Sequence, residues 1–270
     1  MSEPAPAQVR AVLELLQRVL PSRLLGVYLV GSAVSSRLRP DSDLDILAVT
    51  DRSLMPDERT ALVRQLFVIS GWSGHPERRA GHPLRPIELT VLTREDLHDH
   101  SDWRDFQYGE WLRAELEADP APARAHDPDI VIVIAAALDA NRALWGAALE
   151  SLTPPVSPVR LRDAVAGALP DVVANLSGDE RNVLLTLARM LVTVRTGRVV
   201  SKDDAAGIVA TELTPAHASV LRTAADAYRG TRTDDWPDPE PARSLANTLQ
   251  TMVLDALETS SGTAATEDPR

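Results

Sequence analysis

Two aspartates separated by one residue, Asp43 and Asp45, restrict the possible fold of this chain more than any other feature. Alternate side chains of a strand lie on the same face, so carboxylates at this spacing come within a few ångströms of each other. Such carboxylates repel unless a cation lies between them, and hard oxygen ligands of this kind suit Mg²⁺. The pattern therefore predicts a strand that begins at a magnesium site.

A Gly-Ser pair ends the preceding apolar segment, ten residues before the first aspartate. Gly31 lets the backbone come close to a ligand, and Ser32 offers a hydroxyl and an amide where a helix would begin, which favours a phosphate there. A strand edge with two solvated aspartates and an unrelated turn is the alternative. The full spacing, strand to loop to strand, favours a triphosphate site with a metal clamp.

A third carboxylate lies in a later alternating segment, PIELTVLT, over residues 86–93. If this strand lies beside the aspartate strand, Glu88 points at the same site, with Ile87 and Leu89 on the opposite face. Glu88 is then either a third metal ligand or a general base that takes a proton from an acceptor hydroxyl. An exposed polar position on a half-buried strand is the alternative, since alternation requires polar residues somewhere.

The hydrophobic periodicity changes along the chain. Residues 6–20 and 56–70 have the spacing of amphipathic helices, and short strand-like segments lie between and after them. From Asp129 onward the pattern is helical only, beginning with a long apolar stretch, IVIVIAAALDANRALWGAALESL, that exceeds the length of a strand. A proline-rich segment over residues 153–158 is hostile to helix and marks a domain boundary.

We therefore predict an α+β fold with two domains. The N-terminal domain, residues 1–153, combines a mixed β-sheet with helices; the C-terminal domain, residues 154–260, is a helical bundle, and residues 261–270 are a disordered tail. The expected strands cover residues 25–30, 43–50 and 86–93, and a loop covers 71–85. The helices expected in the second domain cover residues 159–174, 178–196, 202–212, 215–229 and 239–259.

Composition excludes several classes of protein. The chain has 270 residues and no cysteine, which excludes disulfides, thiolate nucleophiles and Cys-based zinc sites and suits a reducing cytoplasm. It shows neither a signal peptide nor the ~20 apolar residues that cross a bilayer, so we expect a soluble cytoplasmic protein without a membrane partner. The formal charge of −11 argues against a nucleic-acid surface and suits a cationic small ligand.

Three stretches follow one another in an order that identifies a family. They are RPIELTV at residues 85–91, QYGEWLR at 107–113, and GDERNVLLTLAR at 178–189, continued by Thr196-Gly197 and Lys202-Asp203. From about Leu25 to Tyr228, the chain resembles the aminoglycoside (3'')(9) adenylyltransferases, the streptomycin and spectinomycin resistance enzymes. They are part of the nucleotidyltransferase superfamily that includes DNA polymerase β, so the resemblance implies a nucleotidyltransferase domain at the N-terminus.

The last of these stretches is also informative by itself. Ser177 and Glu180 have the spacing of a capping box, which predicts a helix from about Gly178. Its polar and apolar residues separate onto two faces, and the polar face mixes an anion, an amide and a guanidinium, as a wall of a binding cleft would. A solvated helix face is the alternative. The polar face comprises Asp179, Asn182, Thr186 and Arg189.

The resemblance implies how ATP is bound. Arg189 and Lys202 would reach the phosphates, for which their charges are suited, and Tyr228 would contact ATP as well. Asp129 matches a nucleotide-side position, although a residue favoured by the helix dipole is an equal alternative. The predicted ATP-binding set is completed by Gly31, Ser32 and Ser42.

The resemblance also implies the antibiotic side. Asp179 would bind the cationic or hydroxyl-rich drug, and Trp111 would cover an apolar sugar face, with a core tryptophan as the alternative. Asn175 stands near the place where the family commonly has an aspartate on the streptomycin side, and Asn182 occupies a position that varies among relatives. Because an amide removes an anion that could meet guanidinium groups, these departures favour spectinomycin over streptomycin.

We therefore expect transfer of AMP from ATP to a hydroxyl of an aminocyclitol or aminoglycoside antibiotic, with Mg²⁺ held by Asp43 and Asp45. Glu88 acts as base and completes the catalytic set with the two aspartates. Adenylylation of a protein or of another small metabolite is an alternative reaction for the same catalytic half, and a degenerate nucleotide-binding regulator is the alternative without catalysis. Nucleic-acid polymerisation is disfavoured because the composition offers no basic groove.

Overall fold

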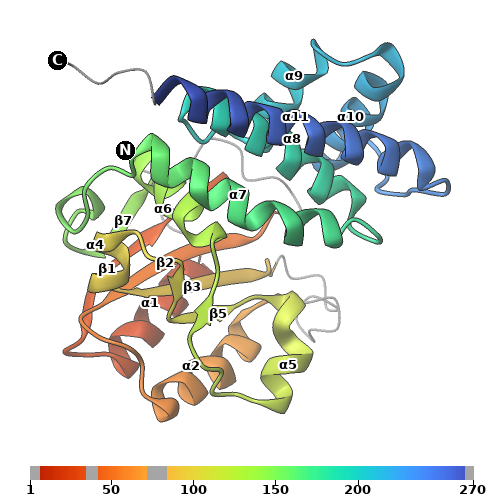
Figure 1. Ribbon diagram of the computed structural model, residues 1–270. Helices are drawn as coiled ribbons and strands as arrows, with labels where there is room; N and C mark the ends of the chain where they lie inside the picture. The colour runs from red at the N-terminus through yellow and green to blue at the C-terminus, as the bar shows by residue number, and fades with distance from the viewer. Residues whose placement is uncertain (1–6, 35–41, 72–83, 265–270) are drawn as a thin grey trace, which may run out of the picture. The chain divides into compact units, whose positions relative to one another are not determined.

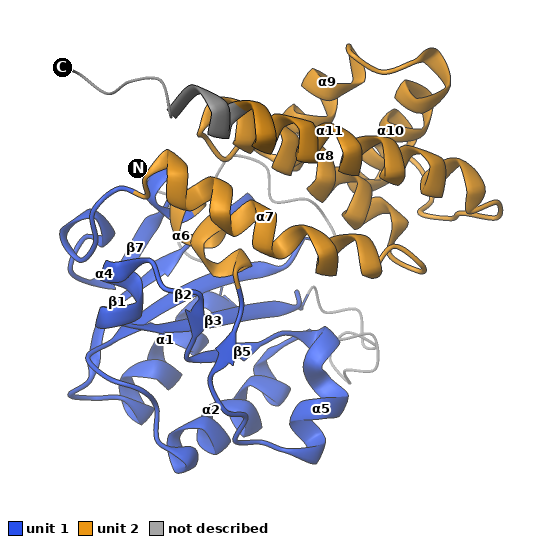
Figure 2. Cartoon of the chain, in the orientation of Figure 1, with its two compact units in different colours: residues 1–127, 137–155 blue, residues 128–136, 156–270 orange. Residues whose placement is uncertain are grey.

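The computed structural model describes residues 7–34, 42–71 and 84–264, with side chains as far as residue 259. The chain divides into two compact units (Figure 2). Unit 1 comprises residues 1–127 and 137–155, and unit 2 comprises residues 128–136 and 156–270. The break after Pro155 lies close to the expected boundary, whereas residues 128–136 join the second unit rather than the first.

Unit 1 is built on a five-stranded sheet in the order β5-β3-β2-β1-β7 (Figure 1). Strands β2 and β3 are parallel and the other neighbours are antiparallel, so the predicted mixed sheet is confirmed. The three predicted strands are present within one residue of their expected limits. The strands are β1 (Leu24–Leu29), β2 (Leu44–Thr50), β3 (Ile87–Thr93), β5 (Phe106–Tyr108) and β7 (Arg142–Gly146).

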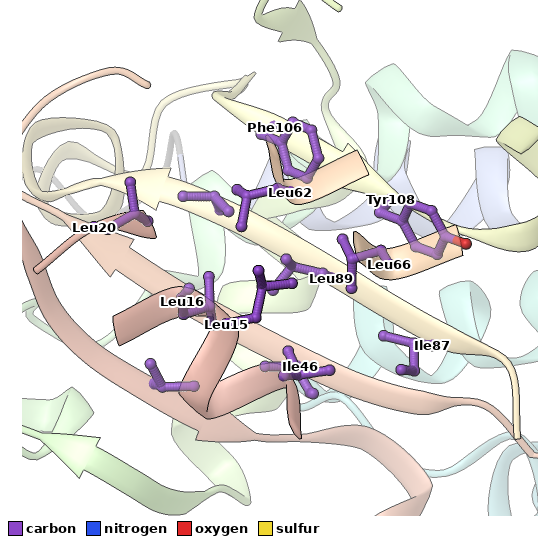
Figure 3. Packing of buried hydrophobic residues seen from close by; sticks show 14 of the residues in the cluster. Leu15, Leu16, Leu20, Ile46, Leu62, Leu66, Ile87, Leu89, Phe106 and Tyr108 are labelled. Carbon is purple, nitrogen blue, oxygen red and sulfur yellow. The ribbon is translucent and has the colours of Figure 1, made fainter. Parts of the chain in front are cut away.

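One face of this sheet is covered by two helices, α1 (Ala7–Val19) and α2 (Pro56–Ile69). Ile46 of β2 and Leu89 of β3 are fully buried in the same cluster as Leu15 of α1 and Leu66 of α2 (Figure 3). Burial of each such side chain contributes about 1.5–3 kcal/mol. Because successive strand residues alternate faces, the residues preceding Ile46 and Leu89 lie on the face turned away from these helices.

Shorter elements complete unit 1. Strands β4 (Trp103–Arg104) and β6 (Ala125–His126) form a separate two-stranded antiparallel sheet. Between β4 and β5, the fully buried carboxylate of Asp105 pairs with the Arg59 guanidinium of α2 at 2.8 Å. The remaining elements are η1 (Gly31–Ala33), α4 (Arg94–Asp99), η2 (Glu110–Leu112), α5 (Arg113–Ala118) and η3 (Leu149–Ser151).

The prediction of one long helix from Asp129 onward is wrong, because this apolar stretch forms a helix followed by a strand. Helix α6 ends at Asp139, and the Asn141 side-chain amide donates to the Ala137 carbonyl oxygen at 2.9 Å, satisfying an acceptor of the last turn. Residues 142–146 then pair with β1 as the edge strand β7. Asp139, Asn141 and Arg142 interrupt the apolar stretch at this point, but hydrophobic periodicity alone does not distinguish a helix that continues from a helix followed by a strand.

Unit 2 is helical, as predicted. Helix α8 begins at Glu180 rather than Gly178, with Asp179 as the N-cap residue. The predicted capping box of Ser177 is therefore wrong: Gly178 has a left-handed φ of 88°, and its N–H donates to the Glu180 carboxylate. The helices are α6 (Asp129–Asp139, whose end belongs to unit 1), α7 (Pro158–Ala174), α8 (Glu180–Thr196), α9 (Lys202–Ala210), α10 (Pro215–Tyr228) and α11 (Glu240–Ala264).

Two further expectations concern the C-terminus and membranes. Helix α11 continues to Ala264, so residues 261–264 are helical and were wrongly assigned to a disordered tail; residues 265–270 lie outside the described residues. Most of the loop expected over residues 71–85 also lies outside them. Among the helices that are described, none has the length and apolar character required to cross a membrane.

Candidate active site

The parallel register of β2 and β3 brings two of the predicted catalytic residues together. Asp45 and Glu88 are direct partners across the two strands, and the Leu44 N–H donates to the Pro86 carbonyl oxygen at 2.9 Å where the pairing begins. Both acidic residues are half-buried and lie on the face turned away from α1 and α2. The expectation that the 86–93 strand lies beside the aspartate strand is confirmed.

The turn after β1 lies directly against Asp45. Gly31 has a left-handed φ of 65°, and a Cβ atom on it would lie 2.0 Å from Asp45 Oδ2. The neighbouring Val30 N–H donates to the Asp45 carbonyl oxygen at 3.0 Å, which fixes the distance between turn and strand. Only glycine combines this backbone conformation with this close approach. Ser32 follows in η1, where its side chain is half-buried.

Ser42 and Asp43 immediately precede β2. The Arg85 guanidinium donates from Nη1 to the Ser42 carbonyl oxygen at 3.1 Å and so anchors this approach to the strand. The Ser42 hydroxyl oxygen is buried and has no hydrogen-bond partner among the described residues. A buried hydroxyl without a partner is costly unless a ligand satisfies it, so Ser42 fits a site for a polar ligand.

The carboxylates of this site fit a hard metal ion. Asp45, which the turn at Gly31 approaches closely, and Asp43, two residues before it, match the small number of carboxylates that Mg²⁺ takes from proteins that also bind nucleotide phosphates. Within the described ranges, no group of three Asp, Glu, His or Cys side chains is arranged to hold a metal ion. Glu88, the cross-strand partner of Asp45, lies next to the candidate metal ligands, where either a base or a third ligand would be placed.

Two nitrogen donors approach the Glu88 carboxylate from neighbouring strands. Gln107 Nε2 of β5 lies 3.5 Å from Glu88 Oε1, and Arg104 Nη1 of β4 lies 4.0 Å from the same oxygen. Sequence reasoning missed both residues. Arg104 stands alone in WRDFQY, with no spacing or repeat that would have distinguished it from a surface arginine.

Trp111 lies on η2 with 54% of its surface exposed, so the alternative of a core tryptophan does not hold. A Cβ on Gly109 would lie 2.5 Å from the Trp111 ring, which shows that the indole folds back over this glycine. The turn is anchored by Glu110, which accepts from the Tyr108 hydroxyl and from Arg113 Nε, both at 2.7 Å. An exposed, fixed ring of this kind can stack on a ligand.

Unit 2 gathers charged residues around the starts of α8 and α9. Burial and the neighbouring Arg189 guanidinium lower the pKa of Lys202 to about 8, while Asp179 and Asp129 oppose this shift. Asp129 and Arg189 also line one hollow of the helical unit, together with Thr186. These residues were assigned to ATP or drug from the resemblance, and the fold brings them close enough to affect one another's charge.

The other predicted residues of unit 2 lie on helix ends. Asn182 Nδ2 donates to Asp179 Oδ1 at 2.7 Å across the first turn of α8. Asn175 ends α7, where its side-chain amide donates to the Asp171 carbonyl oxygen at 3.0 Å and is exposed. Tyr228 ends α10 and is half-buried.

Comparisons with known families and proteins agree with this division of the chain. The family model "Nucleotidyltransferase domain" matches residues 9–106, and the family model "Aminoglycoside adenylyltransferase, C-terminal domain" matches residues 151–253. The first match contains the aspartate pair and Glu88, and the second contains Asp179, Arg189 and Lys202.

Individual proteins match over nearly the whole chain. A spectinomycin 9-adenylyltransferase of Campylobacter jejuni is 37% identical over 257 residues, covering 94% of this chain and 97% of the relative. An aminoglycoside (3'')(9) adenylyltransferase of Escherichia coli is 33% identical over 231 residues, covering 84% and 86%. The crystal structure of an Enterococcus spectinomycin adenyltransferase with ATP and spectinomycin superposes with a TM-score of 0.84 at 30% identity, covering 92% and 98%.

Proposed function

The chain belongs to the aminoglycoside adenylyltransferase family, and from this premise we propose that it transfers AMP from ATP to a hydroxyl group of spectinomycin. The observation that carries the proposal is the in-register pair of Asp45 and Glu88 beside the turn at Gly31. This arrangement places a candidate base next to a candidate metal and phosphate site. Relatives whose names specify spectinomycin make it the first acceptor to test.

The proposed reaction is a single displacement at the α-phosphorus of ATP. The Glu88 carboxylate accepts the proton of the antibiotic hydroxyl, whose oxygen forms a bond to the α-phosphorus. The bond between this phosphorus and the bridging oxygen of pyrophosphate breaks, and pyrophosphate leaves with the electron pair. Arg189 and Lys202 stabilise negative charge on the phosphates, because ammonium and guanidinium groups bind them through charge-assisted hydrogen bonds.

Dependence on Mg²⁺ is part of the proposal. Asp43 and Asp45 would hold the ion, and Gly31, Ser32 and Ser42 would contact the phosphates beside it. When bound, Mg²⁺ would stabilise negative charge on the phosphate oxygens. We propose the cytoplasm as the working compartment, since ATP is the co-substrate and the chain contains no cysteine.

Residues of both units would contribute to antibiotic recognition. Trp111 offers an exposed, anchored ring to an apolar sugar face. Asp179 and Asn182 offer an anion and an amide that are already linked to each other. Asn175 lacks the charge that would favour the guanidinium groups of streptomycin, so we propose a preference for spectinomycin over streptomycin.

The test is a turnover assay on purified protein with ATP and Mg²⁺, offering spectinomycin and streptomycin separately and detecting adenylylated product by mass spectrometry. We expect product with spectinomycin and less with streptomycin, and no product with either when Mg²⁺ is removed by a chelator. Asp45→Asn should abolish turnover, whereas Asp51→Asn, just after the end of β2, should not.

Two outcomes of this assay would change or refute the proposal. Equal turnover of both antibiotics would show that an amide at position 175 does not set the preference. No product with either, from protein that binds ATP, would refute antibiotic adenylylation and leave protein or metabolite acceptors for the same catalytic half.

A further inference from the structure

We propose that Arg104 is a positioning residue that orients the Glu88 carboxylate for proton transfer, an inference that rests on the proposed role of Glu88. Arg104 is 4% exposed and belongs to the two-residue strand β4. Of the residues that its guanidinium approaches in the described part of the chain, Asp127, Thr90 and Glu88, Glu88 is the one with a proposed catalytic role. Its contribution to catalysis would therefore be made through that carboxylate.

The backbone around Arg104 is held on two sides. Arg104 pairs with Ala125 of β6 in the small sheet, and the next N–H, of Asp105, donates to the Val91 carbonyl oxygen of β3 at 3.1 Å. Trp103 beside it is packed edge-on against His126, with ring centroids 5.6 Å apart. These contacts fix the backbone from which the Arg104 side chain extends, next to strand β3, which carries Glu88.

The guanidinium spans two carboxylates. Its Nη2 lies 2.6 Å from Asp127 Oδ2, while Nη1 lies 3.4 Å from Thr90 Oγ1 and 4.0 Å from Glu88 Oε1. Glu88 and Thr90 are two residues apart on β3 and share a face, so one planar fork can reach both. The short contact with Asp127 anchors the guanidinium of Arg104. Its Nη1 remains within ion-pair distance of Glu88.

A structural role alone accounts poorly for this arrangement. Burying a guanidinium is costly unless its donors are matched, and Arg104 Nε has no hydrogen-bond partner among the described residues. A salt bridge to Asp127 alone would require neither the burial of Arg104 nor its approach to Glu88, so a purely structural role leaves both unexplained.

Gln107, three residues after Arg104 in the same segment, adds a second nitrogen donor. It pairs with Thr90 across β3 and β5, and its Nε2 lies 3.5 Å from Glu88 Oε1. The amide and the guanidinium therefore approach one oxygen of Glu88 from two strands. Such a pair fixes the direction of the carboxylate, and a shift of about 1 Å in a reacting group can reduce turnover about 100-fold.

A double-mutant cycle tests the inference. Arg104→Gln should lower kcat about 10- to 100-fold and leave the KM for ATP within about twofold, because the nucleotide contacts are intact. In a Glu88→Gln background the same substitution should cause almost no further loss, since the group it orients is already gone. An equal loss of kcat in both backgrounds would overturn the inference in favour of general structural damage.

The matched control is Arg23→Gln, which removes another buried guanidinium of unit 1 that is paired with carboxylates, Asp51 and Glu58, at the end of β2 remote from Asp45. It should lower the melting temperature without changing the kcat of the folded enzyme. If the wild-type protein adenylylates no antibiotic, the proposed function fails, and crystal structures of wild type and Arg104→Gln still decide the positioning role. A Glu88 side chain in the same place in both structures would refute that role.

Discussion

The pair of strands β2 and β3 and the first turn of α8 both carry residues assigned to catalysis or recognition, but they are held very differently. Asp45 and Glu88 are fixed by seven residue pairs in parallel register and lie beside a buried arginine. Asp179 is exposed, and its side chain accepts a hydrogen bond from Asn182 of the same turn.

This difference separates two tasks. Proton transfer and displacement at phosphorus depend on precise atomic positions. The residues that perform them are therefore best placed on strands whose neighbours fix the positions of their side chains. Recognition of a drug can be adjusted at an exposed helix start without disturbing a core. Substitutions in the first region should therefore reduce turnover with any acceptor, whereas those in the second should change affinity for a particular antibiotic.

The largest effect is expected for Glu88→Gln. Loss of the proton acceptor should reduce kcat with spectinomycin about 10³-fold, within the range of general base catalysis, and leave ATP affinity by calorimetry nearly unchanged. Glu95→Gln, an exposed position on α4, is the matched control and should behave as wild type. If Glu88→Gln turned over spectinomycin at close to the wild-type rate, Glu88 would not be the general base.

Gly31→Ala should give the next largest effect. The left-handed φ of 65° costs an alanine about 1 kcal/mol, and its Cβ would force the Asp45 carboxylate to move. We expect about 100-fold lower turnover. Gly197→Ala, with φ of 68° but no atom nearer than 3.8 Å to its Cβ, should lose similar stability and keep activity. Equal turnover in the two variants would show that close contact with Asp45 is unimportant.

Asp179→Ala should have a smaller effect, confined to the drug. A lost hydrogen bond from a charged group corresponds to about tenfold weaker spectinomycin binding by calorimetry, with ATP binding changed much less. Asp179→Asn keeps a side-chain oxygen that can accept from Asn182, and so separates the loss of this hydrogen bond from the loss of charge. If both variants bind spectinomycin like wild type, Asp179 has no part in recognition and the division between the two regions fails.

The smallest effect is a pH dependence of ATP affinity. Because the pKa of Lys202 is lowered to about 8, its ammonium is charged below that pH and loses its proton as the pH rises through it. ATP should therefore bind about threefold to fivefold more weakly at pH 9 than at pH 7, as a charge-assisted contact is lost. Lys202→Arg should remove this dependence, since arginine keeps its charge. Wild-type affinity that is constant over this range would contradict a contact of Lys202 with the phosphates.

The sequence predicted the strands that carry chemistry because their alternation and bounding turns are local signals. Residues 43–46 and 87–91 alternate polar and apolar side chains, which is enough to fix which of them face the core, and residues 44–50 pair with 87–93 in parallel register. Strand β7 was missed because the polar residues that separate it from α6, Asp139, Asn141 and Arg142, were not interpreted as the end of that helix. Strands β4 and β6 have two residues each, too few for any periodicity.

The site was predictable only where spacing or resemblance marked a residue. Asp43, Asp45 and Glu88 could be proposed from spacing, whereas Arg189 and Lys202 came from the resemblance alone. Arg104 carried no signal in the sequence. Gln107 begins the QYGEWLR stretch, but its position beside Glu88 could not be predicted, because it depends on which strands become neighbours. The helix start at Glu180 was misplaced since the turn at Gly178 uses a left-handed conformation that a capping pattern does not encode.

The path of the chain between its two units limits how one unit can be exchanged for the corresponding unit of a relative. It passes from one unit to the other after Asp127, after Ala136 and after Pro155. A fragment cut at the proline-rich segment would carry residues 128–136 away from the unit to which they belong, and would leave buried residues such as Ile130 and Ile134 exposed. Exchange of the helical unit between relatives therefore needs three junctions, and a chimaera joined only after Pro155 would take residues 129–136, most of α6, from the wrong parent.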